Sequence, residues 1–186
     1  MITRAITSLY DTYDDAAQTV RDLENAGIPN DDVSMVASNL DDRLSHTDMT
    51  NAATGAATGG SIGGALGGGA GLLAGLGMLA IPGVGPVVAA GWLVATAVGA
   101  VAGAGTGAVA GGLIGSLTEA GVSEDDAHVY LEGVRRGGTL VTARIGEDLV
   151  SMVEQIMRRH HPVDPDLREK GYRAQGWTAF DATAKP

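Results

Sequence analysis

The residues most able to do chemistry are the histidines and the acids beside them. His160 and His161 are adjacent, and Asp164 and Asp166 follow shortly after. Such a group holds a metal ion only if its side chains converge, whereas adjacent residues diverge along a helix or a strand. We therefore predict a solvated helix end here and no metal site.

Two further patterns lack the parts that a catalytic or phosphate-binding motif needs. His128 and Glu132 stand one helical turn apart, with no third metal ligand nearby in the sequence. The glycine-rich stretch 67–71 is not followed by Gly-Lys-Ser/Thr, and no acid lies about 20 residues further on, as dinucleotide binding requires. No nucleophile-elbow motif is present. We predict a protein that is not an enzyme and has no cofactor.

The composition narrows the classes of partner. The chain of 186 residues has a formal net charge of −10 and no cysteine. Disulfides and thiol catalysis are thereby excluded. An acidic chain without a basic cluster cannot neutralise phosphates well, so we predict no nucleic-acid partner. The first residues lack the basic stretch and apolar run of a secretory signal, and we expect the charged flanks to lie in the cytoplasm.

Glycines at intervals of four residues dominate the middle of the chain. Residues four apart share one face of an α-helix, so each series makes a stripe without side chains, against which another helix can pack closely. A flexible linker is the alternative, but linkers do not hold a strict period or this much Leu, Val and Ile. The predicted helix-packing residues are Gly55, Gly59, Gly63, Gly67, Gly71 and Gly75 in one ladder, and Gly99, Gly103, Gly107, Gly111 and Gly115 in the other.

Residues 49–118 contain no Asp, Glu, Lys, Arg or His, which suits an apolar environment. About 24 residues precede a central turn and about 32 follow it, and as helices each part exceeds the roughly 30 Å of a bilayer core. We therefore predict a helical hairpin whose bulky tip faces lipid. The predicted turn residues are Pro82, Gly83, Gly85 and Pro86. The predicted tip residues are Leu72, Leu73, Leu76, Leu79, Trp92 and Leu93.

The N-terminal flank predicts a β-α-β unit. Residues 2–9 and 32–37 are rich in β-branched or alternating apolar residues, as strands are. Thr12-x-x-Asp15 is a variant of the capping box and begins a helix that runs to about Ala26. Gly27 and Pro29 end this helix.

The C-terminal flank predicts a similar unit. Ser123 begins a helix, residues 139–145 form a strand, residues 149–157 form a second helix, and residues 160–163 add a short strand. Because each flank alone is too short for a good core, we predict one α+β domain, a small ferredoxin-like sandwich interrupted by the glycine-zipper hairpin. The expected boundaries are 1–48 and 119–163 for the two halves, 49–118 for the hairpin and 164–186 for the tail.

Four stretches of the flanks carry a resemblance to a known family: Ile2-Thr-Arg-Ala-Ile-Thr-Ser-Leu-Tyr-Asp11, Leu23-Glu-Asn-Ala-Gly-Ile28, Ala120-Gly-Val-Ser-Glu-Asp-Asp-Ala127 and Glu132-Gly-Val-Arg-Arg-Gly-Gly-Thr-Leu-Val141. Through them both flanks resemble bacterial heat-induced or general-stress-protein domains. In members with a glycine-zipper insertion, the resemblance extends to the middle of the chain. It implies a small stress-associated domain with no catalytic residues to carry over.

These features predict a stress-associated membrane protein that homo-oligomerises through its glycine-zipper hairpin. Its expected partners are copies of itself and the lipid bilayer, at the bacterial inner membrane with the α+β domain in the cytoplasm. The alternative is a soluble cytoplasmic scaffold, such as a ring, shell or filament, with the hairpins in a proteinaceous core. A third interpretation is a regulatory domain that binds a small ligand.

Overall fold

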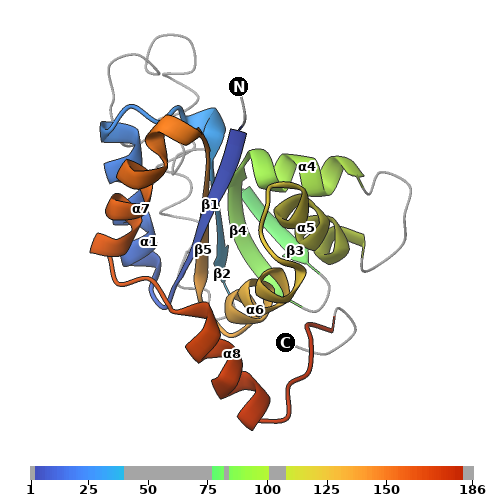
Figure 1. Cartoon of the computed structure of the whole chain (residues 1–186). Helices are drawn as coiled ribbons and strands as arrows, with labels where there is room; N and C mark the ends of the chain where they lie inside the picture. Colours follow the sequence, from blue (N-terminus) through green and yellow to red (C-terminus); the bar gives the residue numbers. More distant parts are fainter. Residues whose placement is uncertain (1–2, 40–76, 82–83, 101–107, 182–186) are drawn as a thin grey trace.

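The computed structural model describes residues 3–39, 77–81, 84–100 and 108–181 as one antiparallel sheet with helices on both faces (Figure 1). The α+β class predicted from the sequence is thus confirmed. The arrangement has one layer more than the expected sandwich, because helices cover both faces of the sheet.

The sheet interleaves segments from distant parts of the chain. Its order is β1-β5-β2-β4-β3, and every neighbouring pair is antiparallel. The C-terminal flank thus supplies a strand that lies between two strands of the N-terminal flank. The strands are β1 (Thr3–Tyr10), β2 (Val33–Ser38), β3 (Gly77–Ile81), β4 (Gly85–Gly91) and β5 (Thr139–Gly146).

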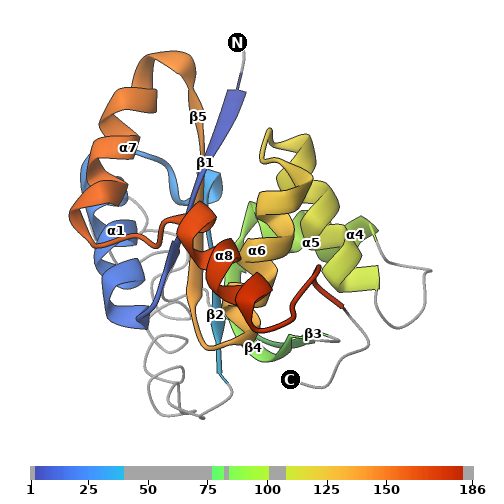
Figure 2. The same cartoon turned by 60° about the horizontal axis from the view of Figure 1, so that its bottom comes forward.

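The helices form two groups and one outlier (Figures 1 and 2). One face of the sheet carries α1 (Tyr13–Asn25) and α7 (Val150–Arg159). The other face carries α4 (Trp92–Ala100), α5 (Ala108–Glu119) and α6 (Glu124–Arg135). The outlier, α8 (Pro165–Ala174), lies at one end of the sheet. Among the described residues, the short 3-10 helices η1 (Asn30–Asp32) and η3 (Glu147–Leu149) precede β2 and α7.

The helix starts follow the sequence signals. The Thr12 hydroxyl accepts a hydrogen bond from the Asp15 amide at 3.1 Å and donates one to the Asp15 carboxylate at 2.6 Å. Ser123 makes the same pair of bonds with Asp126, again at 3.1 and 2.6 Å. Each cap satisfies an amide that the helix leaves unpaired and contributes about 1 kcal/mol. The predicted capping-box variant at Thr12 is therefore confirmed.

Strand residues alternate between two apolar cores, one on each face of the sheet. Within β1, for example, Leu9 belongs to the core under α4, α5 and α6, whereas Tyr10 belongs to the core under α1 and α7. Val36 and Met35 of β2 divide in the same way, because successive side chains of a strand point to opposite faces. The central strands therefore need apolar residues at nearly every position.

The predicted helical hairpin is wrong between residues 77 and 91, which form the strands β3 and β4. Both strands join the sheet, so residues 77–81 and 85–91 belong to the same sheet as the strands of the flanks. Val87, Val88, Ala89 and Ala90 are all buried, and a continuous apolar run is compatible with either a buried strand or a helix. The turn was predicted between two helices, whereas the described elements on either side of residues 82–83 are the strands β3 and β4.

Two predictions for the C-terminal part are also wrong. Residues 160–163 are not a strand, although the Val163 amide donates a hydrogen bond to the Leu9 carbonyl at 2.7 Å. The segment expected to be a tail contains α8, whose start is marked by Asp164 as N-cap and Pro165 at the first helical position. This Asp-Pro pair is a helix-start signal that could have been recognised in the sequence.

Candidate functional sites

The structure describes only part of the predicted helix-packing set. Of the eleven ladder glycines, Gly99 lies in α4, and Gly111 and Gly115 lie in α5. The ladder from Gly55 to Gly75 lies outside the described residues, as do Gly103, Gly107, Leu72, Leu73, Leu76, Pro82 and Gly83. For all of these, helix packing, turn formation and lipid contact stay predictions.

The predicted tip residues inside the described part do not form a tip. Leu79 lies in β3, and the turn residues Gly85 and Pro86 lie in β4. Leu93 is buried in the core between the sheet and α5, because α4 follows β4 directly and lies over the sheet. Trp92 is half-buried, and the Arg144 guanidinium lies over its ring at 5.0 Å from the centroid.

Helix α5 has one buried and one exposed face. Ala110, Leu113 and Leu117 are buried in the core, whereas Gly111 and Gly115 are exposed. A Cβ atom added at either glycine would meet no other atom of the described chain within 4 Å. The fold of this part therefore does not require glycine at these two positions. We call the exposed strip of α5 that carries Gly111 and Gly115 the glycine face.

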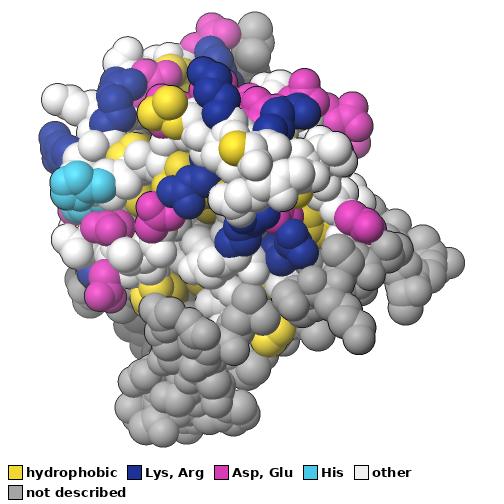
Figure 3. Space-filling model, turned by 90° about the horizontal axis from the view of Figure 1, so that it is seen from below, with side chains coloured by type: hydrophobic (Ala, Val, Ile, Leu, Met, Phe, Trp, Pro, Cys, Tyr) yellow, Lys and Arg dark blue, Asp and Glu magenta, His cyan; other side chains and the backbone are white. Residues whose placement is uncertain are grey.

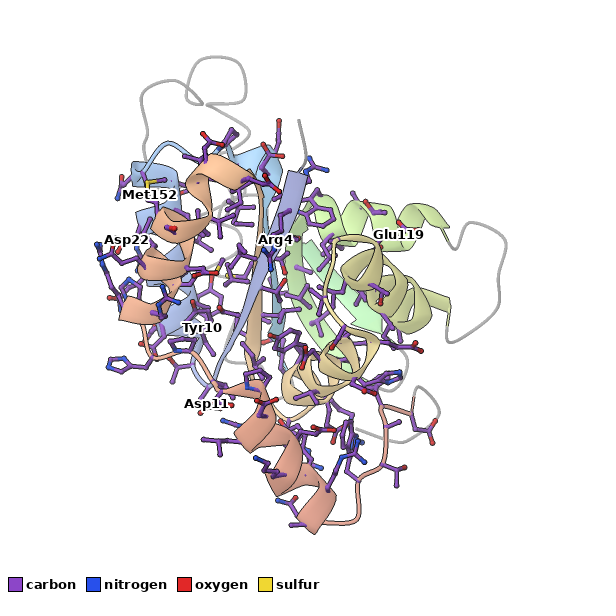
Figure 4. All side chains as sticks on the ribbon, in the orientation of Figure 1. Arg4, Tyr10, Asp11, Asp22, Glu119 and Met152 are labelled. Carbon is purple, nitrogen blue, oxygen red and sulfur yellow. The ribbon has the colours of Figure 1, made fainter. Side chains whose placement is uncertain are left out.

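A second feature is a hollow of about 520 Å³ at the end of the sheet, between α8, the end of α6 and the end of β1. Figure 3 views the molecule from this side and shows Lys and Arg side chains gathered on it. Figure 4 places Asp11 at the end of β1, beside α8. The lining consists of Asp11, Arg136, His161, Pro162, Val163, Asp164, Leu167, Arg168, Gly171, Tyr172 and Gln175.

Two arginines at the hollow are held by carboxylates and an aromatic ring. Arg168 donates from Nη2 to both oxygens of Asp11, at 2.8 and 2.9 Å. Arg136 donates to Glu132 at 2.6 Å and to the Gln175 side chain at 2.6 Å. Its guanidinium also lies over the Tyr172 ring, 4.3 Å from the centroid.

Glu132 is the buried anion that fixes the end of α6. Its side chain is fully buried and accepts hydrogen bonds from Arg135 as well as Arg136. Burial alone would raise the pKa of Glu132, but the hydrogen bonds and charges of the two arginines outweigh it and lower the pKa. Glu132 is therefore ionised and structural.

Tyr172 supplies a buried polar atom to the hollow. Burial raises the pKa of its hydroxyl, and the neighbouring Arg168 works in the opposite direction. Arg168 can only donate to this hydroxyl, and no group in the described part of the chain accepts the hydroxyl proton. A buried hydroxyl without a partner is costly, so its proton favours an acceptor.

The side chains of the adjacent His160 and His161 have different neighbours. His160 pairs with Asp22 at 3.0 Å, while His161 adopts a left-handed backbone with φ of 56° and lines the hollow. Within the described residues, no three His, Asp or Glu side chains converge as metal ligands would. Among the helices of that same part, none combines the length and apolarity needed to cross a membrane.

Comparison with known proteins adds one finding. Residues 5–82 match the family described as the heat induced stress protein YflT domain. The matched segment includes β1, α1 and β2 and extends through β3. No curated protein and no solved structure matches the chain. The match supports a relation to a bacterial stress-protein family and a stress-associated role for this chain.

Sequence reasoning did not find the hollow. Glu132, Arg135 and Arg136 have the spacing of an ion-pair cluster at a helix end, and this signal was available. Tyr172 and Arg168 stand in a polar segment after the last predicted element. Their approach to Arg136 and Asp11 depends on where α8 lies, which no local pattern specifies.

Proposed function

We propose that this protein is a non-enzymatic, stress-associated protein that associates with copies of itself through glycine-bearing helices. The observation that carries the proposal is the glycine face of α5. Glycine costs about 1 kcal/mol relative to alanine in a helix interior. Since Gly111 and Gly115 are exposed and a side chain would fit at both, no packing within the described domain compensates for this loss of helix stability.

Contact with a second molecule would compensate for this loss of helix stability. A helix surface without side chains allows another backbone to approach closely, and four-residue spacing keeps the smooth strip on one side. No acid or base interrupts α5 before Glu119 at its end, so a partner helix meets no charge there. The partner we propose is another copy of this chain, with no role for nucleic acid, metal or cofactor.

Two settings suit such an assembly, and a specific observation favours each. The uncharged run 49–118 favours the bacterial inner membrane, with the acidic domain in the cytoplasm. The burial of Leu93, Leu113 and Leu117 inside the domain favours a soluble assembly, because these apolar side chains already have protein neighbours. Fractionation of cells without detergent, followed by sizing, separates the two settings. Carbonate-resistant membrane recovery supports the first, and a large soluble particle supports the second.

The double variant Gly111→Leu and Gly115→Leu tests the glycine face itself. Both side chains have open space in the monomer, so the domain should fold while the close approach between molecules is blocked. We expect the assembly to shrink to monomers in size-exclusion chromatography with light scattering. Gly171→Leu is the matched control, since Gly171 is an exposed helical glycine of α8 with open space and no place in the ladder. An unchanged assembly in the double variant would refute the proposal.

A further inference from the structure

We propose that the hollow beside α8 binds a small organic carboxylate, which takes the place of Asp11 on Arg168. The site is independent of the glycine face, because it is built from α8, the end of α6 and the end of β1. Its volume of about 520 Å³ lies within the range of small-molecule sites.

Tyr172 indicates that an acceptor belongs in the hollow. The residue lines the hollow and is only 4% exposed, and its buried hydroxyl has no acceptor for its proton at hydrogen-bond geometry within the described chain. Arg168 can only donate, so it cannot accept the hydroxyl proton. An oxygen atom that binds the Arg168 guanidinium from within the hollow would also be available to the Tyr172 hydroxyl.

Asp11 shows which chemical group Arg168 selects. Both of its oxygens bind one nitrogen, Nη2, which leaves Nε and Nη1 of the guanidinium outside this pair. The Asp11 side chain is 65% exposed, and exposed ion pairs are weak because water competes for both charges. A free carboxylate that also reaches Tyr172 gains a bond that Asp11 does not make, so it can displace Asp11 toward solvent.

The local charges favour a ligand with a single negative charge. Arg135, Arg136 and Arg168 lie among the carboxylates of Glu132, Asp11 and Asp164, the last of which caps α8, and Asp181 adds a negative charge near Arg135. When Asp11 moves away from Arg168, the site lacks one negative charge, and a monocarboxylate restores it. A phosphate dianion would overcompensate among carboxylates that remain in place.

The apolar part of the lining defines the rest of the ligand. Leu167 is 67% exposed at the rim, and Pro162 and Val163 line the same hollow. These side chains offer a surface to a short alkyl chain, whose burial strengthens binding with each methylene group. We therefore expect hexanoate to bind more tightly than acetate, and both more tightly than inorganic phosphate.

The test is a titration of the full chain with hexanoate, acetate and inorganic phosphate, followed by NMR chemical shifts and calorimetry. Tyr172→Phe removes only the hydroxyl and should weaken hexanoate binding about tenfold, the usual scale of a hydrogen bond to a charged group. Arg168→Gln should abolish binding. Arg158→Gln is the matched control, because Arg158 is an exposed arginine of α7 outside the hollow.

Asp11→Asn gives the sharpest result, because it should strengthen binding. Removal of the competing carboxylate should tighten hexanoate binding by up to about fivefold, in line with the strength of an exposed ion pair. Asp14→Asn removes the same charge three residues away and should leave the affinity nearly unchanged. Weaker or unchanged binding in Asp11→Asn, no saturable binding of hexanoate, or tighter binding of phosphate would each overturn the proposal. Circular dichroism melts verify that each variant is folded.

Discussion

Helices α5 and α6 are consecutive, lie on the same face of the sheet and use glycine in opposite ways. A Cβ atom at Gly133 of α6 would overlap the side chain of buried Leu9, so any larger residue there would force Leu9 out of its place in the core. At Gly111 and Gly115 of α5 the same atom would meet nothing within 4 Å in the described chain. Glycine in α6 is thus explained by the domain, whereas glycine in α5 points to something beyond it.

Charge separates the two helices in the same way. Helix α6 has the Ser123 cap, acids in its first turn and the buried Glu132 held by two arginines in its last turn. Helix α5 has neither an acid in its first turn nor a base in its last turn. Polar contacts within the chain stabilise α6, so we expect substitutions there to change folding and substitutions on the glycine face to change association.

The largest effect should come from Glu132→Ala. The change leaves two arginines without the anion between them, and loss of one member of a buried ion pair costs about 3–5 kcal/mol. Arg135 and Arg136 are 20% and 34% exposed and can turn toward water. We therefore expect the free energy of unfolding, measured in urea, to fall by about 2–4 kcal/mol. Glu154→Ala breaks an exposed pair with Arg158 and should cost less than about 1 kcal/mol. Equal losses in both variants would contradict this assignment.

Gly133→Ala should have the next largest effect. Overpacking costs about 1–3 kcal/mol, and the gain of up to about 1 kcal/mol in helix propensity offsets part of it. We expect a net loss of about 1 kcal/mol in the same urea experiment. The Leu9→Val substitution shortens the side chain that blocks the new methyl group, so it should cost less in the Gly133→Ala background than in the wild type. Additive losses would show that the overlap is relieved elsewhere.

Gly115→Ala should act with the opposite sign and a smaller size. The methyl group has open space on an exposed helix face, so alanine should raise the stability of the dilute protein by up to about 1 kcal/mol. The same change should weaken self-association, which analytical ultracentrifugation over a concentration series measures. A destabilised monomer would show that the glycine face serves the fold after all.

The smallest effect should be the pH dependence of stability that arises from the Glu132 carboxylate of α6. The pKa of Glu132 is lowered from its ordinary 4.5, so its ionised form contributes stability above that value. This contribution is lost as the pH falls through the lowered folded pKa. The stability difference between wild type and Glu132→Gln should therefore shrink upon acidification in urea melts. A difference that does not change with pH would rule out this role of the charge.

The sequence predicted the elements whose signals are local. Thr12 and Ser123 marked helix starts, and the alternating residues of β2 marked a strand that the structure contains. The strand β4 was missed because its residues 87–90 are buried on both faces, which removes the alternation by which strands are recognised. The four-residue spacing correctly placed Gly111 and Gly115 on one helix face. It did not indicate that this face is exposed.

The hollow could not be predicted from local sequence patterns, because its contacts join residues that are far apart in the sequence. Asp11 and Arg168 are 157 residues apart in sequence, and Arg136 and Gln175 are 39 apart. Each pair forms only because α8 lies at the end of the sheet. Ion pairs within one helix, such as those of Glu132, leave a readable spacing, whereas contacts between elements do not.

The position of β5 has a consequence for the time course of folding. It pairs Thr3 with Gly146 and lies between β1 and β2, so an interior strand of the sheet is the last of the described strands to leave the ribosome. Until then, both N-terminal strands expose unpaired backbone edges, which are prone to non-native pairing. Folding that must close so long a loop is slow, and the rate of unfolding rises steeply on heating. During synthesis the edges of β1 and β2 that face β5 in the native sheet therefore stay unpaired until residues 139–146 have emerged.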